Sequence, residues 1–199
     1  MSFFESIPPP PPPEPVRSVR PAWMRPDAVI PGSVAGEALL ARTGRAAVAL
    51  GSFRAYPNGF EFTVHVRTRE EDGFGLGADP FGLHGRPGPR AVGDQLRLGL
   101  EYADGRRTAT TGRSWPRDDA DAGQLILITD GSDGDDHRWD GRFWVHPLPP
   151  DGPVTFVVAW PKYDMAETSA EFDGGAIRAG ARRAVTLWPE EPPAGSGPA

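Results

Sequence analysis

The feature that most constrains the fold is a strict alternation of apolar and polar residues along positions 60–67. In order, these residues are Phe60, Glu61, Phe62, Thr63, Val64, His65, Val66 and Arg67. A period of two sends successive side chains to opposite faces of a β-strand. The sequence therefore predicts a strand of an antiparallel sheet with one buried face and one face in water.

The residues before this strand predict a tight turn. Asn58 and Gly59 both tolerate positive φ, and Asn-Gly is the strongest short-range signal for a β-hairpin. The partner strand is then expected at residues 46–55. A second pair, Asp104-Gly105, predicts another hairpin in the same way.

Further strands are expected along most of the remaining chain, and one helix near its end. Asp173 can cap a helix at residues 174–185, with Phe172 and Ile177 forming a hydrophobic staple. Seven to nine short strands and one late helix predict a mostly β chain folded as a single antiparallel β-sandwich, immunoglobulin-like or similar. A small β-barrel is the alternative. The strands outside the first hairpin are expected at residues 34–41, 95–102, 107–113, 124–129, 139–145, 154–160 and 168–172.

The two ends are too poor in apolar residues to offset the entropy of ordering them. Six consecutive prolines occupy positions 8–13. The sequence predicts a disordered Pro-rich N-terminal arm at 1–32, a sandwich domain at 33–188 and a disordered tail at 189–199. The proline run is either a spacer or a ligand for an aromatic-lined groove.

Charge and cysteine content exclude several classes of protein. The formal net charge is −6 and the arginines are spread along the chain, which disfavours nucleic-acid and membrane-surface partners. The chain has no cysteine, so disulfides and thiolate zinc sites are excluded. The N-terminus has no signal-peptide pattern. We expect a soluble cytoplasmic protein, and the pattern predicts no oligomeric state.

An acidic, Gly-rich stretch is the one candidate for a bound ion. Clustered carboxylates suit calcium, but the spacing does not match an EF-hand loop. The alternative is a solvated turn between two strands. No other cofactor is expected. The candidate ligands are Asp130, Asp133, Asp135 and Asp136.

Two histidines lie on the polar sides of their predicted strands. If the strands of His65 and His146 were neighbours, these side chains could converge with Glu61 and Asp140. Such a cluster would suit a metal or an acid–base pair. The alternative is a set of ordinary surface histidines.

The polar strand faces also resemble a binding surface, because Trp and Arg are enriched at interaction hot spots. The alternative is that the charges only confer solubility and that Trp144 is covered by the Pro-rich segment or the helix. The residues of this candidate binding face are Glu61, His65, Arg67, Arg138, Asp140, Arg142, Trp144 and His146.

No catalytic motif accompanies these features. Neither a G-x-S-x-G nucleophile elbow nor a P-loop is present. The sequence therefore favours a non-catalytic binding or scaffolding protein, with a protein partner favoured over a small molecule. A metal-dependent enzyme and a calcium-dependent binding module are the alternatives.

Overall fold

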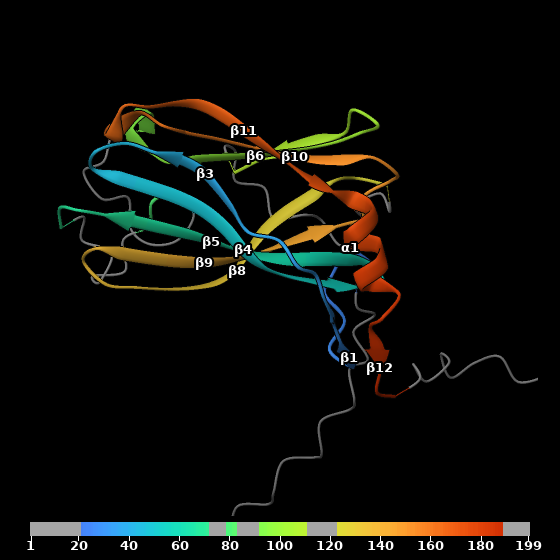
Figure 1. Cartoon of the computed structure of the whole chain (residues 1–199). Helices are drawn as coiled ribbons and strands as arrows, with labels where there is room; N and C mark the ends of the chain where they lie inside the picture. Colours follow the sequence, from blue (N-terminus) through green and yellow to red (C-terminus); the bar gives the residue numbers. More distant parts are fainter. Residues whose placement is uncertain (1–20, 72–78, 83–91, 111–122, 189–199) are drawn as a thin grey trace, which may run out of the picture.

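The computed structural model describes residues 21–71, 79–82, 92–110 and 123–188 of the chain. Its strands form two packed antiparallel layers, with one helix near the C-terminus (Figure 1). The predicted β-sandwich is thus confirmed. Within the described ranges the strands do not close into a barrel.

The larger sheet has the order β2-β4-β5-β9-β8, with β3 also paired to β4. Every pairing in it is antiparallel. The predicted hairpin between β4 and β5 is present, but its turn residues are Pro57 and Asn58, since Tyr56 pairs with Gly59. Neither Asn58 nor Gly59 has the positive φ that the Asn-Gly signal implies. The strands are β2 (Gly32–Ser33), β3 (Ala38–Arg42), β4 (Ala46–Tyr56), β5 (Gly59–Thr68), β8 (Ile126–Gly134) and β9 (Arg138–His146).

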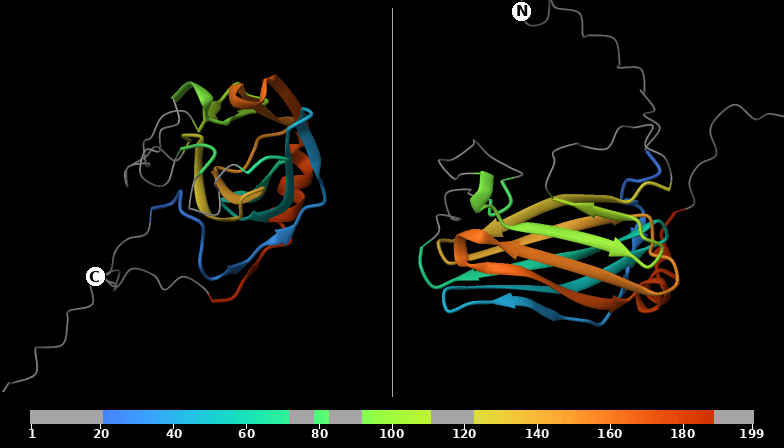
Figure 2. Two further views of the ribbon diagram at one scale, coloured as in Figure 1. Left: turned by 90° about the vertical axis from the view of Figure 1, so that its left-hand side faces the viewer. Right: turned by 90° about the horizontal axis from the view of Figure 1, so that it is seen from above.

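The smaller sheet has the order β11-β10-β6-β7 and faces the larger one (Figures 1 and 2). A separate two-stranded ribbon joins the two ends of the described chain. Eight strands have five or more residues, and four have only two or three. The smaller sheet contains β6 (Arg97–Tyr102), β7 (Arg107–Ala109), β10 (Pro153–Trp160) and β11 (Met165–Asp173), and the ribbon contains β1 (Val29–Ile30) and β12 (Val185–Thr186).

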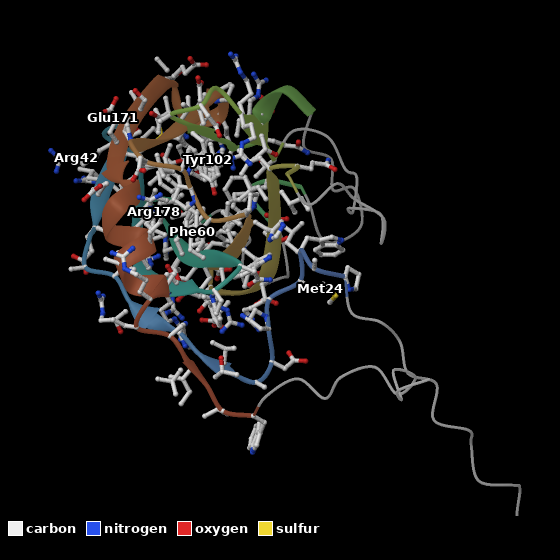
Figure 3. The ribbon with its side chains drawn as sticks, turned by 90° about the vertical axis from the view of Figure 1, so that its right-hand side faces the viewer. Met24, Arg42, Phe60, Tyr102, Glu171 and Arg178 are labelled. Carbon is white, nitrogen blue, oxygen red and sulfur yellow. The ribbon has the colours of Figure 1, made fainter. Side chains whose placement is uncertain are left out.

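The core fills the space between the two sheets. Phe62 of β5 and Phe156 of β10 meet edge to face, with ring centroids 5.0 Å apart. Phe60 and Tyr102 point into the same interior, whereas Arg42 and Glu171 lie on its outside (Figure 3). The alternation along β5 therefore buries its apolar side, as expected.

At one edge the two sheets approach each other through β3 and β11 (Figures 1 and 2). The hydroxyl of Thr168 donates to the carbonyl oxygen of Leu40 at 3.0 Å. This bond joins the two sheets at that edge.

Helix α1 (Gly174–Ala181) covers one end of the sandwich (Figure 1). The carboxylate of its N-cap, Asp173, accepts the N–H of Gly175 at 2.8 Å, as predicted. The helix ends at Ala181 rather than at residue 185, because the chain turns there and Val185–Thr186 pairs with β1. Gly180 packs directly against Gly32, where a Cβ on either residue would overlap the neighbouring segment.

Part of the segment that the sequence assigns to a disordered arm is folded. The arm was expected to extend to residue 32, but residues 21–33 already pack against the sandwich. Trp23 is only 3% exposed, and Val29–Ile30 and Gly32–Ser33 are strands. The rest of the predicted arm, residues 1–20 with the proline run, and the tail at 189–199 lie outside the described residues.

No helix in the described part of the chain is long and apolar enough to cross a membrane.

Candidate binding face

The register of β5 and β9 brings the predicted site residues onto one surface, the outward side of the larger sheet. His65 lies opposite Asp140, and Arg67 lies opposite Arg138. Glu61 lies opposite Trp144 nearer the β4–β5 turn. We call this surface the outer face. It divides into a covered half near the turn and an open half at the far end.

The covered half lies beneath residues 21–25, which we call the covering segment. The indole N–H of Trp144 donates to the carbonyl oxygen of Trp23 at 2.7 Å. The side-chain amide of Asn58 donates to the carbonyls of Ala22 and Met24, at 2.9 and 2.8 Å. Trp144 is 1% exposed. Trp144 is therefore not an exposed hot spot. A segment on its N-terminal side covers it, which is close to the alternative raised from the sequence.

Glu61 is the centre of an ion-pair cluster at the edge of the covering segment. Its two oxygens lie 2.8 Å from the guanidinium of Arg25 and 2.7 Å from that of Arg54. Arg25 also pairs with Asp130. Burial raises the pKa of the neighbouring Tyr56 phenol, and the charge of Glu61 raises it further. Glu61 is 2% exposed, so its role here is to anchor the covering segment.

His146 belongs to the covered half as well. It is buried, and its Nδ1 lies 2.7 Å from the carbonyl oxygen of Asn58. The expected convergence of two histidines and two carboxylates is therefore wrong as a set of four. Only His65 and Asp140 meet, with Nδ1 and Oδ1 2.7 Å apart.

The open half centres on Asp140. Arg67 donates to both of its carboxylate oxygens, at 2.7 and 3.2 Å. Burial by itself would raise the pKa of Asp140, but the hydrogen bonds from Arg67 and His65 outweigh it and hold the pKa below its ordinary value. The carboxylate thus stays ionised and fixes both neighbouring side chains.

Arginine side chains pair with three of the four carboxylates of the candidate calcium site. Arg138 donates to Asp133 and Asp135 at 3.0 and 3.2 Å. Asp130 pairs with Arg25, and Asp136 is exposed in the β8–β9 turn. Among the described residues, no group of three or more His, Asp or Glu side chains is arranged to hold a metal ion.

A hollow of about 440 Å³, which the sequence did not predict, lies beside His65. In the first half of β4 the outward positions carry only small residues, Ala47, Ala49 and Gly51, so the sheet surface dips between β3 and β5. A run of small residues at every second position was the available signal. The lining residues are Glu37, Ala38, Leu39, Ala49, Leu50, Gly51 and His65.

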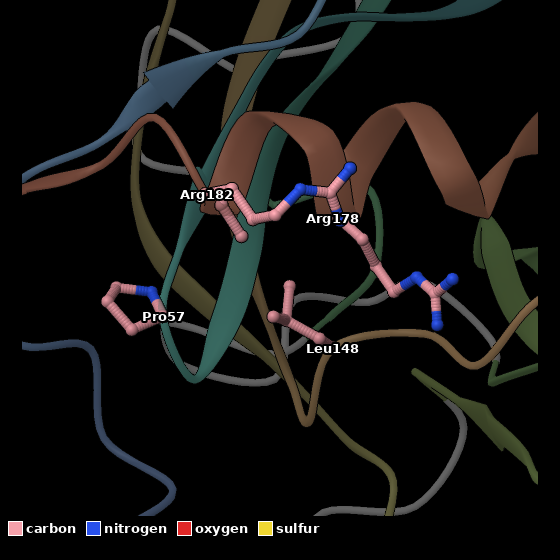
Figure 4. A pocket seen from close by; sticks show the side chains of 5 residues that line it. Pro57, Leu148, Arg178 and Arg182 are labelled. Atoms are coloured by element: carbon pink, nitrogen blue, oxygen red, sulfur yellow. The ribbon is translucent and has the colours of Figure 1, made fainter.

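A second open hollow of about 520 Å³ lies at the α1 end of the sandwich. Arg178 of α1 and Arg182, the residue that follows the helix, border it on one side, and Pro57 and Leu148 border it from the loops (Figure 4). Arg178 is engaged by Asp151. None of the residues predicted for the binding face lines this hollow.

Comparison with family models, curated proteins and solved structures found no match to this chain, so no residue role is transferred to it from another protein.

Proposed function

We propose that this protein is a non-catalytic binding module that contacts a protein partner through the open half of the outer face. The observation that carries the proposal is the cross-strand network around Asp140. The surface consists of His65, Arg67, Arg138, Asp140 and Arg142, with Leu39 beside them.

The network supports binding because it fixes side chains that would otherwise lose entropy when a partner docks. His65 and Arg67 are both held by Asp140, and Arg142 is held by the carbonyl oxygen of Asp130 at 3.1 Å. Preorganised side chains pay less conformational entropy on association. Arginine is also enriched at interaction hot spots.

An apolar anchor lies next to these charges. Leu39 is 58% exposed and lies opposite Ala49 in the register of β3 and β4. Leu39 lines the same hollow as Glu37 and His65, so this apolar contact has polar neighbours, as is common at interfaces. A metal-dependent enzyme has weaker support, because the histidines and carboxylates on which it depended do not converge.

The proposal is tested by site-specific photo-crosslinking in lysate of the native host. p-Benzoylphenylalanine is placed at position 39, and at position 109 as the matched control. Ala109 is exposed on β7 of the smaller sheet. We expect position 39 to capture a protein that position 109 does not.

The affinity of the captured protein is then measured for variants. Arg142→Ala should weaken binding about tenfold, as expected for a hot-spot residue. Arg97→Ala, an exposed arginine on β6, is the control and should leave it unchanged. Equal capture at both positions, or equal affinities of Arg142→Ala and the parent, would contradict the proposal.

A further inference from the structure

We propose that the hollow beside His65 receives the ammonium group of a lysine side chain on the protein partner. This inference rests on the proposed function, and it names the chemistry that the open half of the outer face recognises. Three observations carry it: the contact of His65 Nδ1 with Asp140, the position of Glu37, and the ion pair and hydrogen bond that engage Arg67 and Arg142.

Asp140 determines which ring nitrogen of His65 carries the hydrogen. Asp140 accepts hydrogen bonds from Arg67 and is ionised, so it can only accept from His65 as well. In the neutral ring, the hydrogen must therefore be on Nδ1. Nε2 is left with an exposed lone pair, which makes it an acceptor.

Nε2 and Glu37 lie over the same glycine. A Cβ built on Gly51 would be 3.3 Å from Nε2 of His65 and 3.5 Å from Cγ of Glu37. Glu37 is exposed, and no hydrogen bond or ion pair joins it to another side chain in the described part of the chain. Nε2 of His65 and the stem of Glu37 thus flank a floor that carries no side chain, and both residues line the hollow.

Two cations of the outer face are engaged by other groups of this chain. Arg67 pairs with Asp140, and Arg142 donates to the carbonyl oxygen of Asp130. The polar side chains that line the hollow, Glu37 and His65, both offer acceptors, so the hollow suits a donor from a partner. The side walls, Ala38, Leu39 and Ala49, are apolar.

A lysine side chain has the matching chemistry. Its ammonium is compact and carries three donors, and its four-carbon stem packs on apolar walls. A guanidinium is broader and planar, which suits a flat bidentate acceptor rather than two acceptors across a narrow floor.

The test is an NMR titration of the full chain with Nα-acetyl-lysine methylamide. The control ligand is Nα-acetyl-norleucine methylamide, which keeps an apolar stem and lacks the ammonium. We expect the lysine probe to shift the amide signals of Gly51 and His65 with a Kd of about 1 mM or weaker, as befits one open ion pair. The norleucine probe should leave them in place. Equal responses to the two probes would overturn the proposal.

A matched pair of variants tests whether the negative charge of Glu37 attracts the ammonium group. Glu37→Gln should lower the affinity for the lysine probe about fivefold. Glu167→Gln, an exposed carboxylate on β11, should have no effect. If Zn²⁺ alone shifts the His65 signals and the lysine probe does not, the hollow is a metal site and the proposal fails.

The two proposals fail in distinguishable ways. If Arg142→Ala lowers the affinity for the captured protein but Glu37→Gln does not, lysine recognition is rejected and the proposed binding face is retained. If neither variant changes the affinity for the captured protein, both proposals are rejected.

Discussion

Asp140 connects three neighbouring side chains through a single carboxylate. It accepts from His65 and Arg67, and Arg138 lies 3.8 Å away. Because its pKa is lower in the folded chain than in the unfolded one, ionised Asp140 stabilises the fold. That contribution is fully present above the unfolded pKa of about 3.9. It is lost as the pH falls through the lower, folded pKa.

We therefore expect Asp140→Asn to lower the free energy of unfolding by about 1 kcal/mol at pH 7. The difference from the parent should shrink as the pH falls below about 4 and vanish below the folded pKa. Urea unfolding of both proteins across this pH range measures it. Asp133→Asn is the control, since that carboxylate is 78% exposed and should contribute little. A difference that persists at acid pH would contradict the assignment.

Single residues also show where sequence reasoning stops. The alternation along β5 correctly places Glu61 on the outward side. It cannot show that Glu61 is buried, because the burial comes from Arg25, 36 positions earlier in the chain. The pairing of His65 with Asp140 was expected only if their strands were neighbours, and 75 positions separate them. Periodicity gives the side of a strand, and tertiary contacts decide what covers it.

At the scale of elements, helix α1 depends on its cap more than on its composition. It has eight residues, of which Gly174, Gly175 and Gly180 are glycines that disfavour a helix. A short helix of poor propensity is marginal alone. The hydrogen bond from Gly175 to Asp173 and the burial of Ile177 therefore stabilise a large part of it.

We expect Asp173→Ala to lower the free energy of unfolding by about 1 kcal/mol, the usual contribution of an N-cap side chain. Asp173→Asn is the matched control, because asparagine also accepts a hydrogen bond at this position. Thermal unfolding monitored by circular dichroism compares the two. Equal losses in both variants would mean that the charge of Asp173, and not its capping bond, is what matters.

The long elements were predictable because they repeat a pattern often enough to be recognised. Six strands, β4, β5, β8, β9, β10 and β11, have eight or more residues. The sequence predicts β4, β5, β9 and β10 nearly in full, but only parts of β8 and β11, where the alternation is broken. The strands β1, β2 and β12 have two residues each, too few to show any period. The helix was predicted too long for a related reason. Val185 continues its apolar side, but pairing with Ile30 draws the chain into the ribbon instead.

At the scale of the whole molecule, the covering segment is an integral part of the folded domain, although it precedes the first strand in the sequence. A chain that begins at Pro21 keeps every described contact. A chain that begins at Gly32 lacks Trp23, Arg25 and strand β1. It also leaves the buried side chains of Trp144 and Glu61 without their cover.

We expect removal of residues 1–31 to lower the free energy of unfolding by about 3 kcal/mol, relative to removal of residues 1–20. Thermal unfolding measures the loss. Hydrogen exchange at the Trp144 indole reports the uncovering directly, because that N–H is bonded to the carbonyl oxygen of Trp23. The covering segment would have no such role if the shorter chain were equally stable and its Trp144 equally protected.

A mechanical force that pulls on the chain ahead of Pro21 acts on the covering segment before it acts on the sheets. A pull from that side loads the contacts of Asn58, Trp144 and Glu61 one after another, since they are spaced along residues 22–25. Contacts loaded in sequence peel apart at lower tension than strands sheared together. Local opening of this kind leaves the paired sheets intact. Tension on the N-terminal side would therefore convert a buried tryptophan and a buried carboxylate into a newly accessible surface, next to the open half of the outer face.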